Sequence, residues 1–108
     1  MSVRDLKIKT GVVKRLAKEL ASYEKEATTQ QARIDKLVAS GADIHDINKQ
    51  KEVLDETHQM IPDNKRRLGV AYKELETMVA DLVSADPKLD GSEEILGART
   101  ILSDVTVA

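Results

Sequence analysis

Apolar residues recur at every seventh position over the first third of the chain. This row comprises Leu6, Val13, Leu20, Ala27 and Ile34. A second row, three residues after members of the first, comprises Leu16, Tyr23 and Leu37. Because spacings of three and four residues place side chains on one face of an α-helix, the rows predict a long helix over about residues 3–40 with a continuous apolar seam.

A turn is predicted directly after this helix, at residues 40–42. Gly41 suits the left-handed position that ends a helix, and Asp43 suits the N-cap of the next one. Beyond the turn apolar residues again recur at every seventh position, without a miss, and predict a second helix over about residues 43–84. Its members are Ile47, Leu54, Ile61, Leu68, Leu75 and Leu82.

The short turn makes the two long helices antiparallel neighbours. Folding the chain about the turn places Ile34 opposite Ile47. The same fold places Val13 opposite Leu68, so the two apolar rows are expected to meet in register.

A third, shorter helix is predicted over about residues 92–106. Pro87 and Gly91 interrupt the chain before it, and Asp90 with Glu93 fits a capping box at its start. Its expected apolar face comprises Ile95, Ala98, Leu102 and Val105. At about 22 Å it can cover only part of a second helix of about 60 Å. The hairpin end, about residues 25–60, is therefore expected to hold two helices, and its intervening seam positions are polar: Gln30, Gln50 and Thr57.

Pro62 lies inside the predicted second helix. Proline lacks an amide donor and its ring clashes with a carbonyl one turn earlier, at a cost of about 3 kcal/mol or more. Ile61 and Leu68 keep the seven-residue spacing on both sides, which favours one kinked helix over two separate ones. The predicted fold is an all-α antiparallel three-helix bundle, with residues 1–108 as a single domain and the second helix kinked at Pro62.

Composition supports this fold and limits the chemistry. The 108 residues include no Phe, Trp or Cys and only two Tyr, whereas 33% are charged with a net charge of −2. Interspersed charges of both signs suit exposed helices. The N-terminus lacks an apolar signal core, and no apolar run approaches the roughly 20 residues of a membrane span. We therefore expect a soluble, cytoplasmic protein without disulfides or membrane contact.

No constellation typical of catalysis or metal binding is found. His45 and His58 are thirteen residues apart, and Asp55 lies near only one of them. Gly11 is isolated within a helical pattern and forms no phosphate loop. We expect no enzymatic activity, no metal and no cofactor.

Basic residues gather in two places that the hairpin brings to the same level. The first 18 residues carry six basic residues against Asp5 alone, and residues 65–67 are all basic. Such a face steers toward an acidic protein partner. The alternative is that these charges only solvate the outer helix faces, and Asp63 is spaced to pair with Arg67. The candidate partner-binding residues are Lys14, Arg15, Lys18, Lys65, Arg66 and Arg67.

Specific strings in each helix resemble the tubulin-binding cofactor A family. The first-helix string is Ile8-Lys9-Thr10-Gly11-Val12-Val13-Lys14-Arg15-Leu16, followed by Tyr23-Glu24-Lys25-Glu26. The second helix carries Lys49-Gln50, Val53-Leu54, Glu56-Thr57, Met60-Ile61-Pro62-Asp63, Arg66-Arg67-Leu68 and Ala71-Tyr72. Ala98-Arg99 with Leu102 resembles the third helix. Gly69 and Gly97 depart from the family pattern, where helix formers are expected.

The resemblance implies a chaperone that binds β-tubulin after its release from the cytosolic chaperonin. It would hold this subunit for assembly with α-tubulin by other tubulin-folding cofactors, which it meets only indirectly, and would be cytoskeleton-associated. Two other functions are weighed against it. An acidic pI of about 5.7 disfavours nucleic-acid binding, whereas a coiled-coil-like structural adaptor for another partner stays open. Exposed helix faces are compatible with a monomer or a weak homodimer.

Overall fold

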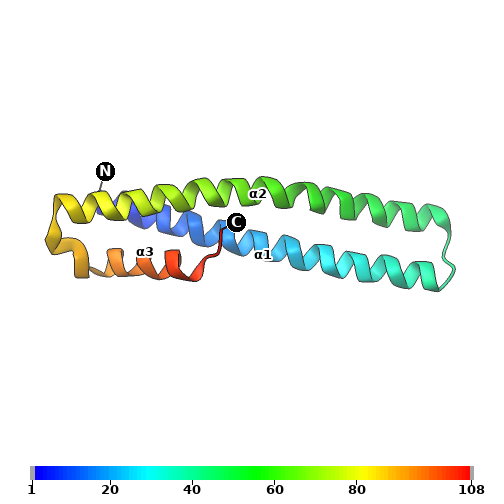
Figure 1. Ribbon diagram of the computed structural model, residues 1–108. Helices are drawn as coiled ribbons and strands as arrows, with labels where there is room; N and C mark the ends of the chain where they lie inside the picture. The colour runs from blue at the N-terminus through cyan, green and yellow to red at the C-terminus, as the bar shows by residue number, and fades with distance from the viewer. Residues whose placement is uncertain (1, 108) are drawn as a thin grey trace. The chain divides into compact units, whose positions relative to one another are not determined.

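The computed structural model describes residues 2–107, which form three α-helices and one 3-10 helix and include no strand. Along the chain these are α1 (Val3–Ala39), α2 (Ile44–Ala85), η1 (Pro87–Gly91) and α3 (Glu93–Asp104) (Figure 1). The structure confirms the predicted all-α helical bundle of two long helices and one short helix. The helix bounds differ from the predicted ranges by one or two residues.

The turn between α1 and α2 begins with a glycine in the left-handed conformation. Gly41 has a φ of 72°. The amides of Gly41 and Ala42 donate back to carbonyls in the last turn of α1, at 3.2 and 3.0 Å, which is the Schellman arrangement. Asp43 Oδ1 accepts the amide of His45 at 2.8 Å. The predicted glycine terminator and the predicted N-cap are both confirmed.

The chain packs as two compact units. The first, the three-helix unit, spans Met1–Lys18 and Lys65–Ala108. The second, the hairpin unit, spans Glu19–Asn64 and contains only parts of α1 and α2 with their turn. Both η1 and α3 belong to the three-helix unit, as the short length of α3 predicts.

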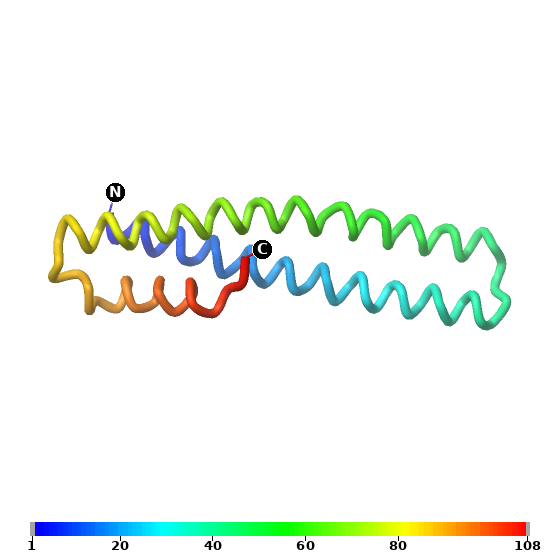
Figure 2. Tube along the Cα trace, viewed as in Figure 1, coloured from blue at the N-terminus to red at the C-terminus, as the bar shows by residue number. Residues whose placement is uncertain are grey.

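Apolar burial forms the core of the three-helix unit. Its largest fully buried side chains come from all three helices and are Leu6, Leu68, Leu75, Ile95 and Val13. Four of these belong to the predicted seventh-residue rows, and Ile95 belongs to the predicted apolar face of α3. Figures 1 and 2 show α3 alongside the beginning of α1 and the end of α2.

Polar contacts fix the helices of this unit around that core. The Tyr72 hydroxyl of α2 donates to the carbonyl oxygen of Leu102 in α3, at 2.6 Å. Lys9 of α1 forms an ion pair with Glu74 of α2. All three helices are therefore joined by directional contacts as well as by apolar packing.

In the hairpin unit the helix seam contains a buried polar layer. Gln30 is only 5% exposed. Its Nε2 donates to the side-chain oxygen of Gln50 at 2.6 Å and to the Gln50 carbonyl at 3.1 Å. Arg33 donates to Gln30 Oε1 at 2.8 Å, so both polar atoms of this amide have partners. The predicted polar seam is thus a hydrogen-bonded cross-link between α1 and α2.

Asn64 is the second buried amide of this unit and is less well satisfied. It is 5% exposed, and its Nδ2 donates to Glu19 Oε2 at 3.3 Å. Within the described residues its Oδ1 has no hydrogen-bond partner. A buried acceptor without a partner is destabilising by about 1–3 kcal/mol.

The predicted capping box at Asp90 and Glu93 is wrong. Ser92 caps α3, because its side-chain oxygen accepts the amide of Ile95 at 3.3 Å. Asp90 lies inside the preceding 3-10 helix, which ends at Gly91, and pairs with Arg99 instead. The α3 helix also ends earlier than predicted, at Asp104, since the following residues, Val-Thr-Val, are β-branched and helix-disfavouring.

Pro62 lies within a continuous helix. α2 runs from Ile44 to Ala85 with Pro62 inside it, so one helix is confirmed rather than two. Pro62 is exposed, and so is His58, the residue whose carbonyl loses its donor. The kink at this residue stays a prediction.

The two glycines Gly41 and Gly11 give opposite predictions for the same change. Gly41→Ala forces a Cβ into a positive φ and should lower the free energy of unfolding by about 1–2 kcal/mol. Gly11 is helical, and a Cβ added there would meet no atom within 4 Å. Gly11→Ala should therefore raise the free energy of unfolding by about 0.5–1 kcal/mol. Urea unfolding followed by circular dichroism measures both, and a gain of stability in Gly41→Ala would contradict the assignment of the turn.

The two buried amides of the hairpin unit also give opposite predictions. Asn64→Leu removes the unpartnered oxygen and should stabilise the protein by about 1 kcal/mol. Gln30→Leu breaks a satisfied network and should destabilise it by about 1 kcal/mol. The same urea titration applies, and a loss of stability in Asn64→Leu would show that its oxygen is satisfied in solution.

Candidate partner-binding surface

All six basic residues singled out from the sequence lie in the three-helix unit, and all are exposed. They comprise Lys14, Arg15, Lys18, Lys65, Arg66 and Arg67. On α1 the neighbouring Val13 and Leu16 are buried, and on α2 Leu68 is buried. The apolar seam therefore turns these side chains outward from both long helices of one unit.

Part of this charge is engaged within the protein. Arg15, Arg66 and Arg67 each interact with other groups of the chain, as does Asp63. The spacing of Asp63 and Arg67 in the sequence already indicated internal matching. The basic surface is thus a set of exposed, partly paired cations on a helical scaffold.

A groove along α2 adds residues that the sequence analysis did not select. It has a volume of about 330 Å³ and adjoins part of the basic surface. Its lining comprises Lys65, Arg66, Gly69, Val70, Tyr72, Lys73, Glu76 and Val107. The α2 residues recur at spacings of three and four, which marks one helix face. This helical spacing could have identified the α2 residues of the groove from the sequence. The place of Val107 in the lining could not have been identified in this way, because it depends on the path of the chain after α3.

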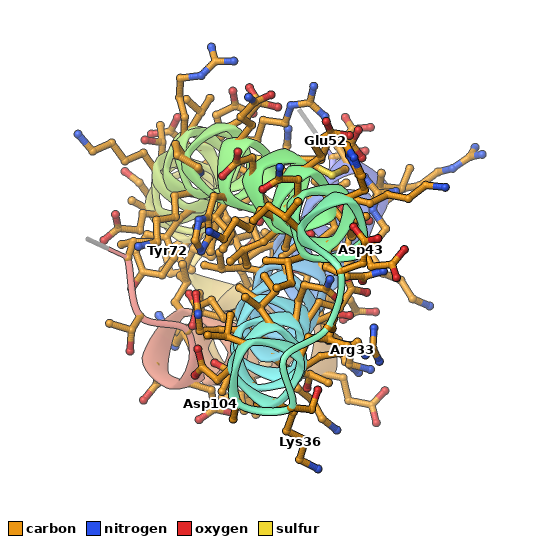
Figure 3. The ribbon with its side chains drawn as sticks, turned by 90° about the vertical axis from the view of Figure 1, so that its right-hand side faces the viewer. Arg33, Lys36, Asp43, Glu52, Tyr72 and Asp104 are labelled. Carbon is orange, nitrogen blue, oxygen red and sulfur yellow. The ribbon has the colours of Figure 1, made fainter. Side chains whose placement is uncertain are left out.

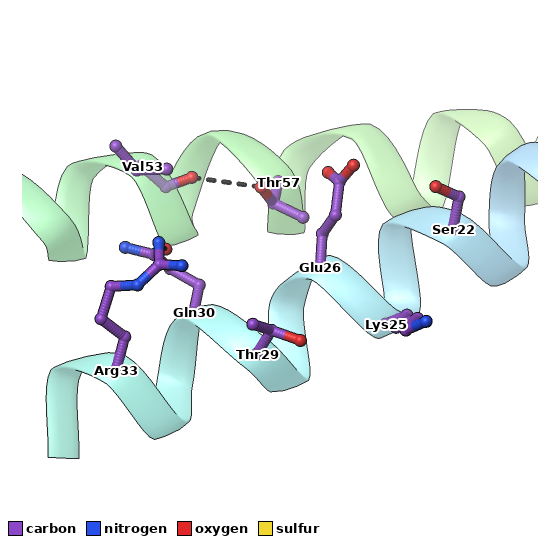
Figure 4. Close-up of a pocket in the computed structure, with 8 residues that line it drawn as sticks. All are labelled: Ser22, Lys25, Glu26, Thr29, Gln30, Arg33, Val53 and Thr57. Atoms are coloured by element: carbon purple, nitrogen blue, oxygen red, sulfur yellow. Dashed lines mark hydrogen bonds between the residues drawn. The ribbon is translucent and has the colours of Figure 1, made fainter. Parts of the chain in front are cut away.

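The hairpin unit has an open groove of a different character. It measures about 350 Å³ and is lined by Ser22, Lys25, Glu26, Thr29, Gln30, Arg33, Val53 and Thr57 (Figure 4). The Thr57 hydroxyl donates to the carbonyl of Val53 in its own helix, at 3.2 Å. Gln30 and Arg33 are joined in the polar layer described above. Of the hydrogen bonds along this groove, those from Gln30 to Gln50 join the two helices. The charges that line the groove are of both signs.

Charged side chains extend outward from the two helices of the hairpin unit. Lys36 and Glu52 are examples, one on each helix (Figure 3). Both histidines, His45 and His58, also belong to this unit and are exposed. In the described part of the chain no three His, Cys, Asp or Glu side chains are grouped to hold a metal ion.

No helix among residues 2–107 has both the length and the apolar character needed to cross a membrane.

Comparisons with known proteins agree with the fold and with the strings in the sequence. The family model described as tubulin binding cofactor A matches residues 1–102. The tubulin-specific chaperone A of Gallus gallus is 47% identical over 103 residues, which is 95% of this chain and 92% of the relative.

Two solved structures share the fold over nearly the whole chain. The human tubulin chaperone cofactor A superimposes with a TM-score of 0.77 at 44% identity, covering 94% of both chains. The tubulin folding cofactor A of Arabidopsis thaliana gives a TM-score of 0.84 at 38% identity, covering 94% of this chain and 92% of that one. From its strings, its fold and these matches, the chain belongs to the tubulin-binding cofactor A family.

Proposed function

We propose that this protein is a tubulin-folding chaperone that binds β-tubulin released from the cytosolic chaperonin. It holds the subunit in the cytosol and passes it to other tubulin-folding cofactors, which assemble it with α-tubulin. The observation that carries this proposal is the family match over residues 1–102, close to the full length of the chain.

The structure supports a binding role rather than catalysis. The grooves at the surface are open. Apolar side chains fill the core, and several others, Ile8 and Leu96 among them, are exposed at the surface. A protein of this kind contributes an already folded surface, so little ordering of its own backbone accompanies binding. We propose that the protein carries out no covalent step and acts by covering a surface of the client.

Charge on the three-helix unit supports recognition of an acidic client. The exposed cations at residues 14–18 and 65–67 raise the local potential even where some are paired. Surface charge of this kind accelerates encounter and selects partners by sign more than it adds affinity. Binding should therefore weaken as salt screens these charges, with a Debye length of about 8 Å at physiological ionic strength.

In the direct test, the purified chain is mixed with β-tubulin freshly released from the chaperonin, and the mixture is separated by size-exclusion chromatography. A stable complex with β-tubulin, and none with α-tubulin treated in the same way, is the expected result. Binding to neither subunit would refute the proposal and would leave the structural adaptor as the alternative.

Reversing four basic residues of the three-helix unit tests where the client binds. The variant Lys14→Glu, Arg15→Glu, Arg66→Glu and Arg67→Glu should weaken the complex with β-tubulin about tenfold or more, because favourable charge becomes repulsive. Affinity is measured by titration at two salt concentrations. The affinity of the variant should depend less on salt than the affinity of the parent chain does.

A matched control keeps the overall charge change equal. Lys25→Glu, Lys36→Glu, Lys49→Glu and Lys51→Glu alter four exposed residues of the hairpin unit. Circular dichroism checks that both variants stay helical. Equal losses of affinity in the two variants would mean that net charge, and not the proposed surface, governs binding.

A further inference from the structure

Gly69 is a helix-interior glycine for which the fold gives no reason. It lies in the middle of α2, where glycine is less favourable than alanine. Its φ is not positive, since Gly41 is the only described residue with that conformation. A Cβ added at Gly69 would meet no atom within 4 Å, so no neighbouring group of the described chain requires the space. The missing side chain leaves room at the surface.

That room is part of the groove on the three-helix unit. Val70 beside it is 55% exposed, although it is apolar and lies next to the buried Leu68 and Ala71. Tyr72 forms part of the lining and is fixed in place, because its hydroxyl donates to the carbonyl oxygen of Leu102. The groove lining therefore combines a glycine, an exposed apolar side chain and an anchored aromatic ring.

The charges along the groove indicate what it would take. Three cations line it, Lys65, Arg66 and Lys73, against one carboxylate, Glu76. A lining of apolar and mainly cationic residues is complementary to an acidic segment that carries an apolar side chain. A volume of about 330 Å³ lies at the small end of ligand sites, which suits part of a short peptide segment rather than a whole helix.

We propose that this groove binds a short acidic segment of the tubulin client, with an apolar side chain of that segment placed over Gly69. The carboxylates of the segment lie toward Lys65, Arg66 and Lys73. This inference rests on the proposed function and deepens it, since it identifies the part of the surface that makes the close contact. Lys73, Gly69 and Val70 become specificity residues.

Gly69→Ala separates binding from stability. The added methyl group should raise the urea midpoint of unfolding, as for any open helical glycine, yet reduce affinity for β-tubulin about tenfold by filling part of the groove. Gly97→Ala is the matched control, because Gly97 lies inside α3, is not part of the groove lining and also has open space where a Cβ would lie. It should raise the midpoint and leave affinity within about twofold of the parent.

Two charge changes along the groove should act in opposite directions. Lys73→Glu should weaken binding and Glu76→Lys should strengthen it, because both residues line the groove with opposite signs. The chain has no cysteine, so Ser40→Cys in the hairpin unit can carry one fluorophore for anisotropy titrations with released β-tubulin.

The outcomes distinguish the two proposals. If the parent chain binds β-tubulin and Gly69→Ala binds equally well, the groove is not the contact, while the proposed function stands. If the parent chain binds no β-tubulin, both proposals fail. If Gly69→Ala alters self-association of the chain alone by size exclusion, and not its binding to β-tubulin, the occupant is a second copy and the proposal is overturned.

Discussion

Burial of the apolar rows on α1 and α2 is the interaction on which the rest of the structure depends. Full burial of one Leu, Ile or Val side chain contributes about 1.5–3 kcal/mol, and the three-helix unit buries five such side chains completely. The ion pair of Lys9 with Glu74 is partly exposed, at 28% and 50% of the side-chain surface, and such a pair contributes at most about 1 kcal/mol. Apolar packing therefore decides the fold, and the outward faces are left available for charge.

The same constraint explains how much of the fold follows from the sequence. Two rows at seven-residue spacing can be buried together only if the helices lie antiparallel about the turn, and Gly41 supplies the one backbone conformation that this turn needs. Local choices between similar residues are harder to predict. Asp90 and Ser92 are both good capping residues, and the choice of Ser92 depends on the 3-10 helix from Pro87 to Gly91, which the sequence pattern does not reveal.

The surface is predictable in part for a related reason. Exposure of the six basic residues follows from their positions between buried seam residues, so helical periodicity is enough to find them. The engagement of Arg15, Arg66 and Arg67 depends on side-chain conformations and could not be deduced. The groove could not be predicted either, because its lining depends on the position of Val107 and on the hydrogen bond from Tyr72 to Leu102. Both depend on how α3 and the residues after α3 pack against α2. In the hairpin unit, the amide layer of Gln30 and Gln50 costs apolar burial but favours one register of the two helices.

Our central claim is that the three-helix unit binds the tubulin client as a preformed surface. Hydrogen–deuterium exchange of the chain, free and in complex with β-tubulin, tests it most directly. The account predicts slower amide exchange on binding within residues 7–18 and 65–76, with the hairpin unit little changed. Slower exchange confined to residues 19–64, or faster exchange throughout the three-helix unit, would contradict it, because the client would then bind elsewhere or require this unit to open.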